Sequence, residues 1–210
     1  MNALAHTQLL SRHTHRPGPE LTVIDGITLP LSRAHEVCGN ARWLLALMVA
    51  GALKGPVFWI TPTWQPETVN PEGMLALADP GRFTFISARR QEDTLWTLEE
   101  VLRSGAVPLV VAEMPDPPAM TPVRRLHLAA ETGAQEGHCT PLALLLTPGK
   151  GGAQGIETRW HMDQAHGSES RAWHLSRLRA RTVPPKTWHL RGRPGQWALS
   201  PTSEATLATG

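Results

Sequence analysis

Five short apolar runs, rich in Val, Ile, Leu and Phe, recur about every 25 residues and constrain the fold of this chain more than any other feature. Helical patterns separate them, and an alternation of short apolar strands with helices is typical of βαβ units. Strands that are apolar on both sides need helices over both faces of their sheet. The sequence therefore predicts an α/β fold with a mostly parallel sheet and helices on both faces, its strands at 33–38, 56–61, 82–87, 106–113 and 141–147.

The segments between these runs carry helix signals. Residues 41–53 are apolar almost all round, as expected of a buried crossover helix. In 70–78, Asn70 is in place to cap a second helix. Residues 91–105 have acids in the first turn and end at Gly105, the residue type favoured for a left-handed C-cap. All three patterns predict helices.

A fourth helix is predicted over 121–133, with Thr121 as the cap and Gly133 at the end. Beyond residue 150 the pattern changes, because Trp and Leu alternate with basic residues and Gly or Pro turns separate the short runs. This alternation is typical of antiparallel strands. We expect C-terminal antiparallel hairpins appended to the parallel sheet.

The 210 residues, 41% of them hydrophobic and 18% charged, suffice for one folded domain with irregular ends. We expect a poorly ordered segment at 1–25, an α/β domain at 26–200 and a flexible tail at 201–210. No apolar run approaches the roughly 18–20 residues that cross a bilayer, and Cys38 and Cys139 are too few for a disulfide framework. These features predict an intracellular protein of a reducing compartment, such as a bacterial cytosol, without membrane contact.

The turn after the first strand is where an α/β protein of this kind would bind phosphate. Here it contains Gly39, Asn40, Ala41 and Arg42. A working phosphate loop needs further glycines, a Lys for the phosphate oxygens and a hydroxyl for Mg²⁺, and this turn has none of them. We therefore expect no nucleotide, cofactor or metal here and regard the turn as a degenerate phosphate loop.

An acidic residue, Glu113, ends the fourth apolar run. Nucleotide hydrolases place the acid that organises Mg²⁺ and water at this point. Without a phosphate loop, we expect no Mg²⁺–nucleotide on which Glu113 could act, so a structural role is favoured over a catalytic one. Asp116 stands in the same situation. We expect no catalytic residue in this chain.

Tryptophan is used unusually, with eight Trp and no Tyr. Trp59, Trp64 and Glu67 fall in and after the second strand, in a Pro-rich segment suited to line a pocket or an interface. A tryptophan can equally be a core residue. The sequence leaves both readings open, and these three residues are the candidates for partner binding.

Charge is distributed unevenly: residues 1–149 hold 11 basic and 14 acidic side chains, and residues 150–210 hold 9 basic and 4 acidic ones. Arg177, Arg179 and Arg181 alternate along a predicted strand, which would place three guanidinium groups on one face. Such a row suits phosphates or an acidic partner. An edge strand kept soluble by its charges explains the pattern equally well.

The order of elements resembles the RecA family core. The stretches LPLSRAHEVCG (29–39) and LRSGAVPLVVAE (102–113) are similar to the family's first-strand approach and to the segment that carries its Walker B acid, so that Glu113 falls on that acid's position. The stretches GNAR, FWITPTWQPETVNPEG, DPGRF, EDTLW, RRLHLAAE and GRPGQW are together similar to the ImuA proteins, also labelled SulA-like. These are degenerate RecA-like accessory proteins that lack a Walker A motif.

The resemblance to ImuA implies a non-catalytic role in the SOS-induced mutasome, which carries out error-prone translesion DNA synthesis. The implied partner is an ImuB-type Y-family polymerase homologue, together with RecA or an error-prone replicative-type polymerase. The implied location is the bacterial cytoplasm, at the nucleoid when partners are bound.

Three alternatives stay open at this point. One is a divergent RecA-like ATPase that uses Glu113, and a second is a SulA-type inhibitor of cell division. The third, compatible with the accessory role, is weak DNA contact through Arg177, Arg179 and Arg181.

Overall fold

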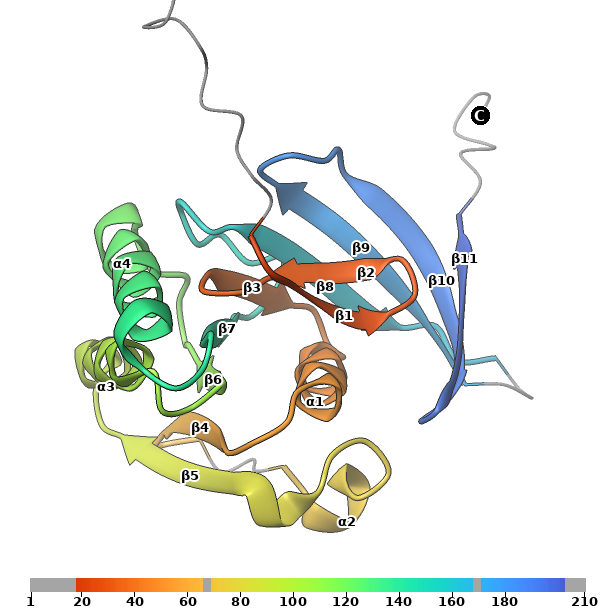
Figure 1. Cartoon of the computed structure of the whole chain (residues 1–210). Helices are drawn as coiled ribbons and strands as arrows, with labels where there is room; N and C mark the ends of the chain where they lie inside the picture. Colours follow the sequence, from red (N-terminus) through yellow and green to blue (C-terminus); the bar gives the residue numbers. More distant parts are fainter. Residues whose placement is uncertain (1–17, 66–68, 168–170, 203–210) are drawn as a thin grey trace, which may run out of the picture.

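The computed structural model describes residues 18–65, 69–167 and 171–202. A nine-stranded sheet runs through them in the order β11-β10-β9-β8-β3-β7-β6-β4-β5 (Figure 1). Its strands are β3 (Ala34–Cys38), β4 (Val57–Pro62), β5 (Phe83–Ala88), β6 (Leu109–Glu113), β7 (Leu142–Leu146), β8 (Thr158–Gln164), β9 (Ala172–Ala180), β10 (Lys186–Arg193) and β11 (Gln196–Pro201).

All five strands expected from the apolar runs are present. They form the parallel half of the sheet, in which β3 pairs with β7, β7 with β6, β6 with β4, and β4 with β5. Every residue of β3, β6 and β7 is buried. Strands covered on both faces read as continuous apolar runs, which is why these segments stand out in the sequence.

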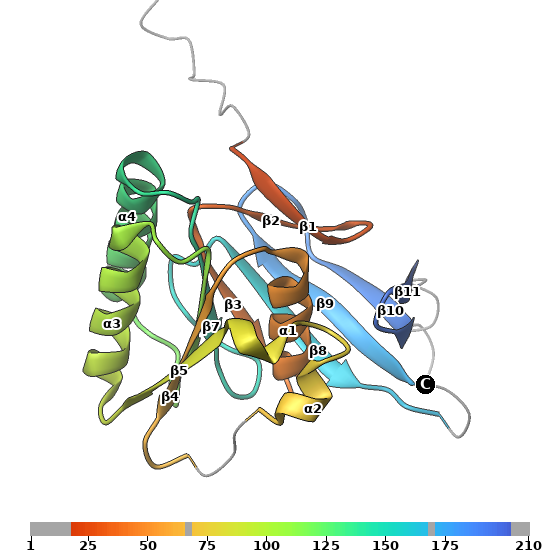
Figure 2. The same ribbon diagram turned by 60° about the horizontal axis from the view of Figure 1, so that its bottom comes forward.

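Helices lie on both faces of the sheet, as predicted. Helix α1 (Arg42–Ala52) packs on one face, and α3 (Gln91–Ser104) and α4 (Met120–Glu136) pack side by side on the other (Figures 1 and 2). Trp59 and Trp160 belong to the core under α1, while Leu98 and Leu126 belong to the core under α3 and α4. The mixed α/β architecture is therefore confirmed.

Two helix ends follow the sequence signals. Gly105 adopts the left-handed conformation (φ 57°) just after α3. The side chain of Asn70 accepts a hydrogen bond from the backbone N–H of Glu72 at 3.0 Å and caps a helix. That helix, α2 (Pro71–Met74), is one turn long, shorter than the predicted 70–78. A short 3₁₀ turn, η2 (Pro80–Arg82), precedes β5.

The predicted bounds of the fourth helix are wrong. Helix α4 starts at Met120 after Ala119, without a side-chain cap from Thr121, and runs on to Glu136. Gly133 lies inside the helix, where an added Cβ would be 2.0 Å from the carbonyl oxygen of Leu102 on α3. This glycine permits close packing between the two helices and does not end one of them.

The C-terminal strands form the expected antiparallel extension. Strand β8 pairs with β3 in parallel and with β9 in antiparallel fashion, and β10 and β11 continue the antiparallel meander. Residues 201 and 202 close the described chain; the rest of the expected tail, 203–210, lies outside the described residues.

An N-terminal hairpin corrects one boundary. Residues 20–24, expected to be poorly ordered, form β1 (Glu20–Ile24), which pairs with β2 (Ile27–Pro30). Leu21, Ile27 and Leu29 are buried in the core under α1, so alternating apolar positions order this segment. Residues 1–17 lie outside the described part of the chain.

Within residues 18–65, 69–167 and 171–202, none of the helices has both the length and the apolar character needed to span a membrane.

Candidate functional site

The turn between β3 and α1 is the segment that the sequence led us to interpret as a degenerate phosphate loop. Gly39 opens it with a positive φ of 90°. A Cβ at this position would be 2.4 Å from the carbonyl oxygen of Met162 on β8. Gly39 is thus required both by the left-handed backbone and by the close approach of the neighbouring strand.

The backbone N–H groups of this turn are already occupied by acceptors from the protein itself. Gly39 N–H donates to the carbonyl of Gly149 (3.1 Å), and Ala41 N–H donates to the carbonyl of Met162 (2.9 Å). Asn40 N–H donates to the carboxylate of Asp163 (2.8 Å). In a phosphate loop such groups point at the bound anion. Here an aspartate on β8 supplies the negative charge.

Arg42 does not extend toward a ligand. Its guanidinium donates to the carbonyl oxygen of Gly39 at 3.3 Å, within the same turn. The sequence analysis selected this turn through Gly39, Asn40, Ala41 and Arg42 but missed Asp163, which bonds to it. The only signal was an acid near the end of a strand, 123 positions away from Asn40.

Glu113, at the carboxyl end of β6, is almost fully buried. Its carboxylate accepts hydrogen bonds from the indole N–H groups of Trp43 (3.1 Å) and Trp59 (2.9 Å) and from the side-chain amide of Gln65 (2.6 Å). Three of the roughly four lone-pair positions of a carboxylate are thereby used. A divalent cation would compete with these donors for the lone pairs, of which about one is left.

A second buried carboxylate, Glu36 on β3, holds the loop that follows β7. It accepts hydrogen bonds from the Thr147 hydroxyl (2.8 Å) and from the backbone N–H groups of Gly152 (2.8 Å) and Ala153 (3.1 Å). It also pairs with Arg159. A buried charge paired and hydrogen-bonded in this way costs far less than an isolated one. The sequence analysis did not select Glu36 as a site residue.

Cys38 follows on the same strand. Burial and the nearby Glu36 carboxylate raise the pKa of its thiol to about 12, and the thiol donates to the carbonyl oxygen of Trp160 at 3.4 Å. A protonated, buried thiol is a poor nucleophile.

Trp59, one of the three candidates for partner binding, does not lie at the surface. Its side chain is fully buried in the core under α1, and its indole N–H donates to Glu113. Trp64, just beyond β4, is 62% exposed and remains a candidate for partner binding. Glu67 lies outside the described residues.

The three arginines of the predicted row do not share a face. A β-bulge interrupts the pairing of β8 with β9: Trp160 pairs with Arg177, and the next residue of β8, Arg159, pairs with Arg179, skipping Leu178. Paired residues lie on the same face of a sheet, and successive residues on opposite faces. Arg177 therefore lies on the face of Trp160, and Arg179 on the face of Arg159.

Arg177 is held by the core side of the sheet. Its guanidinium carbon lies 5.7 Å from the ring centre of Trp160 and 5.4 Å from that of Trp188, and Nη2 donates to the carbonyl oxygen of Pro184 at 3.0 Å. Burial lowers the pKa of Arg177. This arginine is a packing residue.

Arg181 lies beyond the end of β9, where its Nε is 3.8 Å from the carboxylate of Glu157. Arg179 is exposed and takes part in none of the ion pairs formed among the described residues. Of the three arginines in the predicted row, Arg179 alone is an exposed strand residue without an ion pair or a cation–π contact among the described residues.

Comparison with known proteins adds no assignment: no protein-family model matches the chain, and no curated protein matches it.

Proposed function

We propose that this chain is a non-catalytic, RecA-like accessory protein of the ImuA type, which supports SOS-induced, error-prone translesion DNA synthesis by binding an ImuB-type Y-family polymerase homologue. The non-catalytic character is supported by the hydrogen bonding at the two positions where a RecA-like ATPase would bind the phosphates of ATP and its Mg²⁺. The N–H groups of the turn at Gly39–Ala41 bind internal acceptors, and Glu113 is held by two indoles and an amide.

The side chains that make these contacts come from several elements. Asp163 reaches the turn from β8, and Trp43 reaches Glu113 from α1, so one end of the sheet is closed by side chains from several elements. Opening it for a nucleotide would break at least four hydrogen bonds. Among the donors released, the indole N–H of Trp59 is fully buried, and leaving it unpaired would cost about 1–3 kcal/mol. The arrangement thus favours a scaffold over an ATPase.

The accessory role itself rests on the sequence resemblance to ImuA and on a sheet with helices on both faces and antiparallel C-terminal strands, which is the architecture that the resemblance implies. RecA or an error-prone replicative-type polymerase are further partners under this proposal. The proposed location is the bacterial cytoplasm, at the nucleoid when partners are bound.

Trp64 is the best candidate for contact with the protein partner, because exposed tryptophans are enriched among residues that dominate binding energy. The chain offers a matched control in Trp96 on α3, which is 63% exposed. Replacing either tryptophan by alanine removes a similar amount of exposed surface. A difference in partner binding between the two variants therefore reflects where the tryptophan lies on the protein.

The test is co-purification of the tagged full chain with the ImuB-type homologue of the same organism, with and without MgATP, read by size-exclusion chromatography. We expect a complex that is indifferent to ATP, weakened at least tenfold by Trp64→Ala and unchanged by Trp96→Ala. No complex under either condition would refute the accessory role.

A complex formed only with MgATP, or release of heat and phosphate on mixing the chain with MgATP, would refute the non-catalytic part and support the ATPase alternative. Filamentous growth on overproduction, in the absence of any complex, would support the SulA-type alternative.

A further inference from the structure

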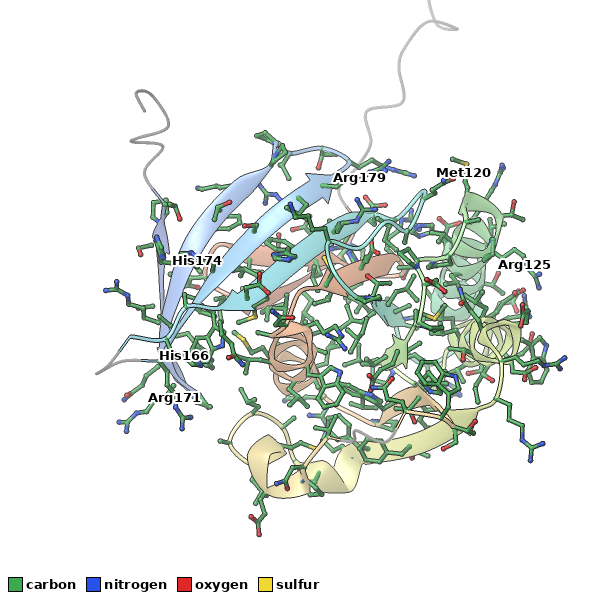
Figure 3. All side chains as sticks on the ribbon, turned by 180° about the vertical axis from the view of Figure 1, so that it is seen from behind. Met120, Arg125, His166, Arg171, His174 and Arg179 are labelled. Carbon is green, nitrogen blue, oxygen red and sulfur yellow. The ribbon has the colours of Figure 1, made fainter. Side chains whose placement is uncertain are left out.

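On one face of the antiparallel half of the sheet, none of the helices in the described residues packs. On β8, Trp160 and Met162 join the core under α1, so the alternating residues Arg159, His161 and Asp163 lie on the opposite side. The core beneath α3 and α4 contains no residue of β8, β9, β10 or β11. Figures 1 and 3 show these helices beside the four strands and not over them.

Strand register identifies the other residues of this surface, which we call the open face. Asp163 pairs with His174, which pairs with His189, and His161 pairs with Ser176, which pairs with Thr187. With the residues alternating along each strand, the open face consists of Arg159, His161, Asp163, Ala172, His174, Ser176, Arg179, Thr187, His189, Arg191, Arg193, Gln196, Ala198 and Ser200.

The side chains of the open face are chiefly donors and cations. The imidazole rings of His174 and His189 lie 4.5 Å apart, and the hydroxyls of Ser176 and Thr187 are 3.0 Å apart. The face carries one carboxylate, Asp163, whose oxygens are engaged by Asn40 N–H at 2.8 Å and by His161 at 3.5 Å. The surface that remains for a ligand is therefore positive.

Three arginines supply that charge. Arg179, Arg191 and Arg193 are exposed and belong to none of the ion pairs among the described residues. Arg193 donates only to the side-chain oxygen of Gln196, at 2.9 Å. Arg191 pairs with Ala172, seven positions before Arg179 on β9, so these two arginines stand about 20 Å apart and would contact different phosphates.

Within the described residues, the regular strand positions of the open face carry neither tryptophan nor a large apolar side chain. The four tryptophans of the C-terminal strands, at 160, 173, 188 and 197, all pack on the opposite side. A single-stranded nucleic acid is usually bound on aromatic stacking platforms, and a protein partner usually needs apolar anchors at the centre of its interface. At the regular strand positions of the open face, the apolar residues are Ala172 and Ala198.

We infer that the open face binds the phosphate backbone of duplex DNA without reading its sequence. A duplex hides its bases and presents phosphates outward, so cations and hydrogen-bond donors suffice to hold it. The β-bulge at Leu178 contributes by turning Arg179 onto this face while Arg177 stays on the tryptophan side. The inference is independent of the proposed polymerase-type partner, because the test below contains no other protein.

The test measures binding of the full chain to a fluorescein-labelled DNA duplex of about 20 base pairs and arbitrary sequence, by fluorescence anisotropy. The titration is repeated over a series of salt concentrations. The slope of log affinity against log salt concentration then counts phosphate contacts, at about 0.9 per contact. The variant is Arg179→Ser, Arg191→Ser, Arg193→Ser combined. The matched control removes three exposed cations elsewhere, by Lys54→Ser, Arg89→Ser and Arg124→Ser combined.

We expect the open-face variant to reduce the magnitude of the slope by about 2.7, while the control leaves it unchanged. An Arg→Lys triple at the same three positions should keep the slope, since the charges are retained. Circular dichroism and thermal melting confirm that each variant is folded.

The inference is overturned if the wild-type chain does not bind the duplex at about 50 mM salt, a concentration at which phosphate contacts are strong. It is also overturned if the open-face serine variant and the control serine variant reduce the slope by the same amount. Tighter binding to a single strand of equal length, or displacement of the duplex by an equal charge concentration of polyglutamate, would reassign the face to single strands or to an acidic protein.

Discussion

The indole N–H of Trp43 on α1 donates to Oε2 of Glu113 on β6 at 3.1 Å, across 70 positions of sequence. The contact ties the first crossover helix to the neighbouring part of the sheet. Trp59 on β4 donates to the other oxygen of the same carboxylate. Glu113 is thus the common acceptor for side chains of α1, of β4 and of the segment after β4, which makes it a structural residue whose removal has a measurable cost.

Replacing Glu113 should therefore destabilise the fold. Glu113→Ala leaves two indole N–H groups and the Gln65 amide without their acceptor, and we expect a loss of about 3 kcal/mol in the free energy of unfolding. Urea unfolding followed by tryptophan fluorescence measures it. Asp116→Ala, an exposed acid three positions later, is the control and should change stability by less than about 0.5 kcal/mol. Equal stabilities of the two variants would show that Glu113 does not hold this site.

Gly39→Ala should be far more costly than its left-handed backbone alone explains. Gly195→Ala shares the positive φ (79° against 90°) but has open space around the added Cβ. We expect a loss of about 1–2 kcal/mol at Gly195 from the backbone alone. The loss at Gly39 should be at least twice as large, because its Cβ meets the backbone of Met162. Thermal melting of the two variants compares them, and similar melting temperatures would contradict the close approach of β8.

Stability should fall in mild acid because of His35. Burial lowers the pKa of this histidine to about 4 from its ordinary value of 6.5. One ring nitrogen faces the carbonyl oxygen of Pro30 at 2.8 Å, and the other faces the Thr158 hydroxyl at 2.7 Å. The native state keeps the ring neutral, whereas the unfolded chain takes up a proton below pH 6.5. The contribution of His35 is complete above that pH and falls by about 3 kcal/mol as the pH drops to 4.

Urea unfolding at a series of pH values tests this dependence. His35→Gln should flatten the curve between pH 6.5 and 4, the two values that bound the titration. His174→Gln, at an exposed histidine, should leave the curve as it is. A steep acid loss that persists in His35→Gln would assign the effect to other groups, such as His127, whose pKa burial also lowers.

Arg177 and Arg179 should behave as residues of different kinds. Arg177→Ala removes a cation from the rings of Trp160 and Trp188, and we expect a loss of about 1 kcal/mol in stability without any change in the salt dependence of DNA binding. Arg179→Ala should do the reverse and reduce the salt slope by about 0.9 with unchanged stability. If both variants affected the same measurement, the bulge would not separate their faces.

The sequence predicted those features of the fold that depend on a few neighbouring residues. Apolar runs marked the five parallel strands, because burial on both faces leaves an uninterrupted signature, and Gly105 marked the end of α3 because few other residues adopt its conformation. The position of Glu113 at a strand end was also correct. Each of these follows from a window of a few residues.

Features that depend on a second segment were not predictable in this way. The bulge at Leu178 is a property of the pairing with β8, so regular alternation wrongly placed Arg177 and Arg179 on one face. Asp163 binds Asn40, and Trp59 binds Glu113, across long sequence separations. Gly133 looked like a helix end because the same residue type serves close packing of helices.

The position of β3 has a consequence for how the chain is made. It is the first parallel strand to be synthesised, yet it lies in the middle of the sheet between β7 and β8, where Val37 pairs with both Leu146 and Trp160. A nascent chain that has reached the end of α4 therefore holds its central strand with both edges open, and truncation before β8 would leave one of them open for good. Strand β3 can therefore have both of its neighbours in the sheet only after residues 142–164 have been synthesised.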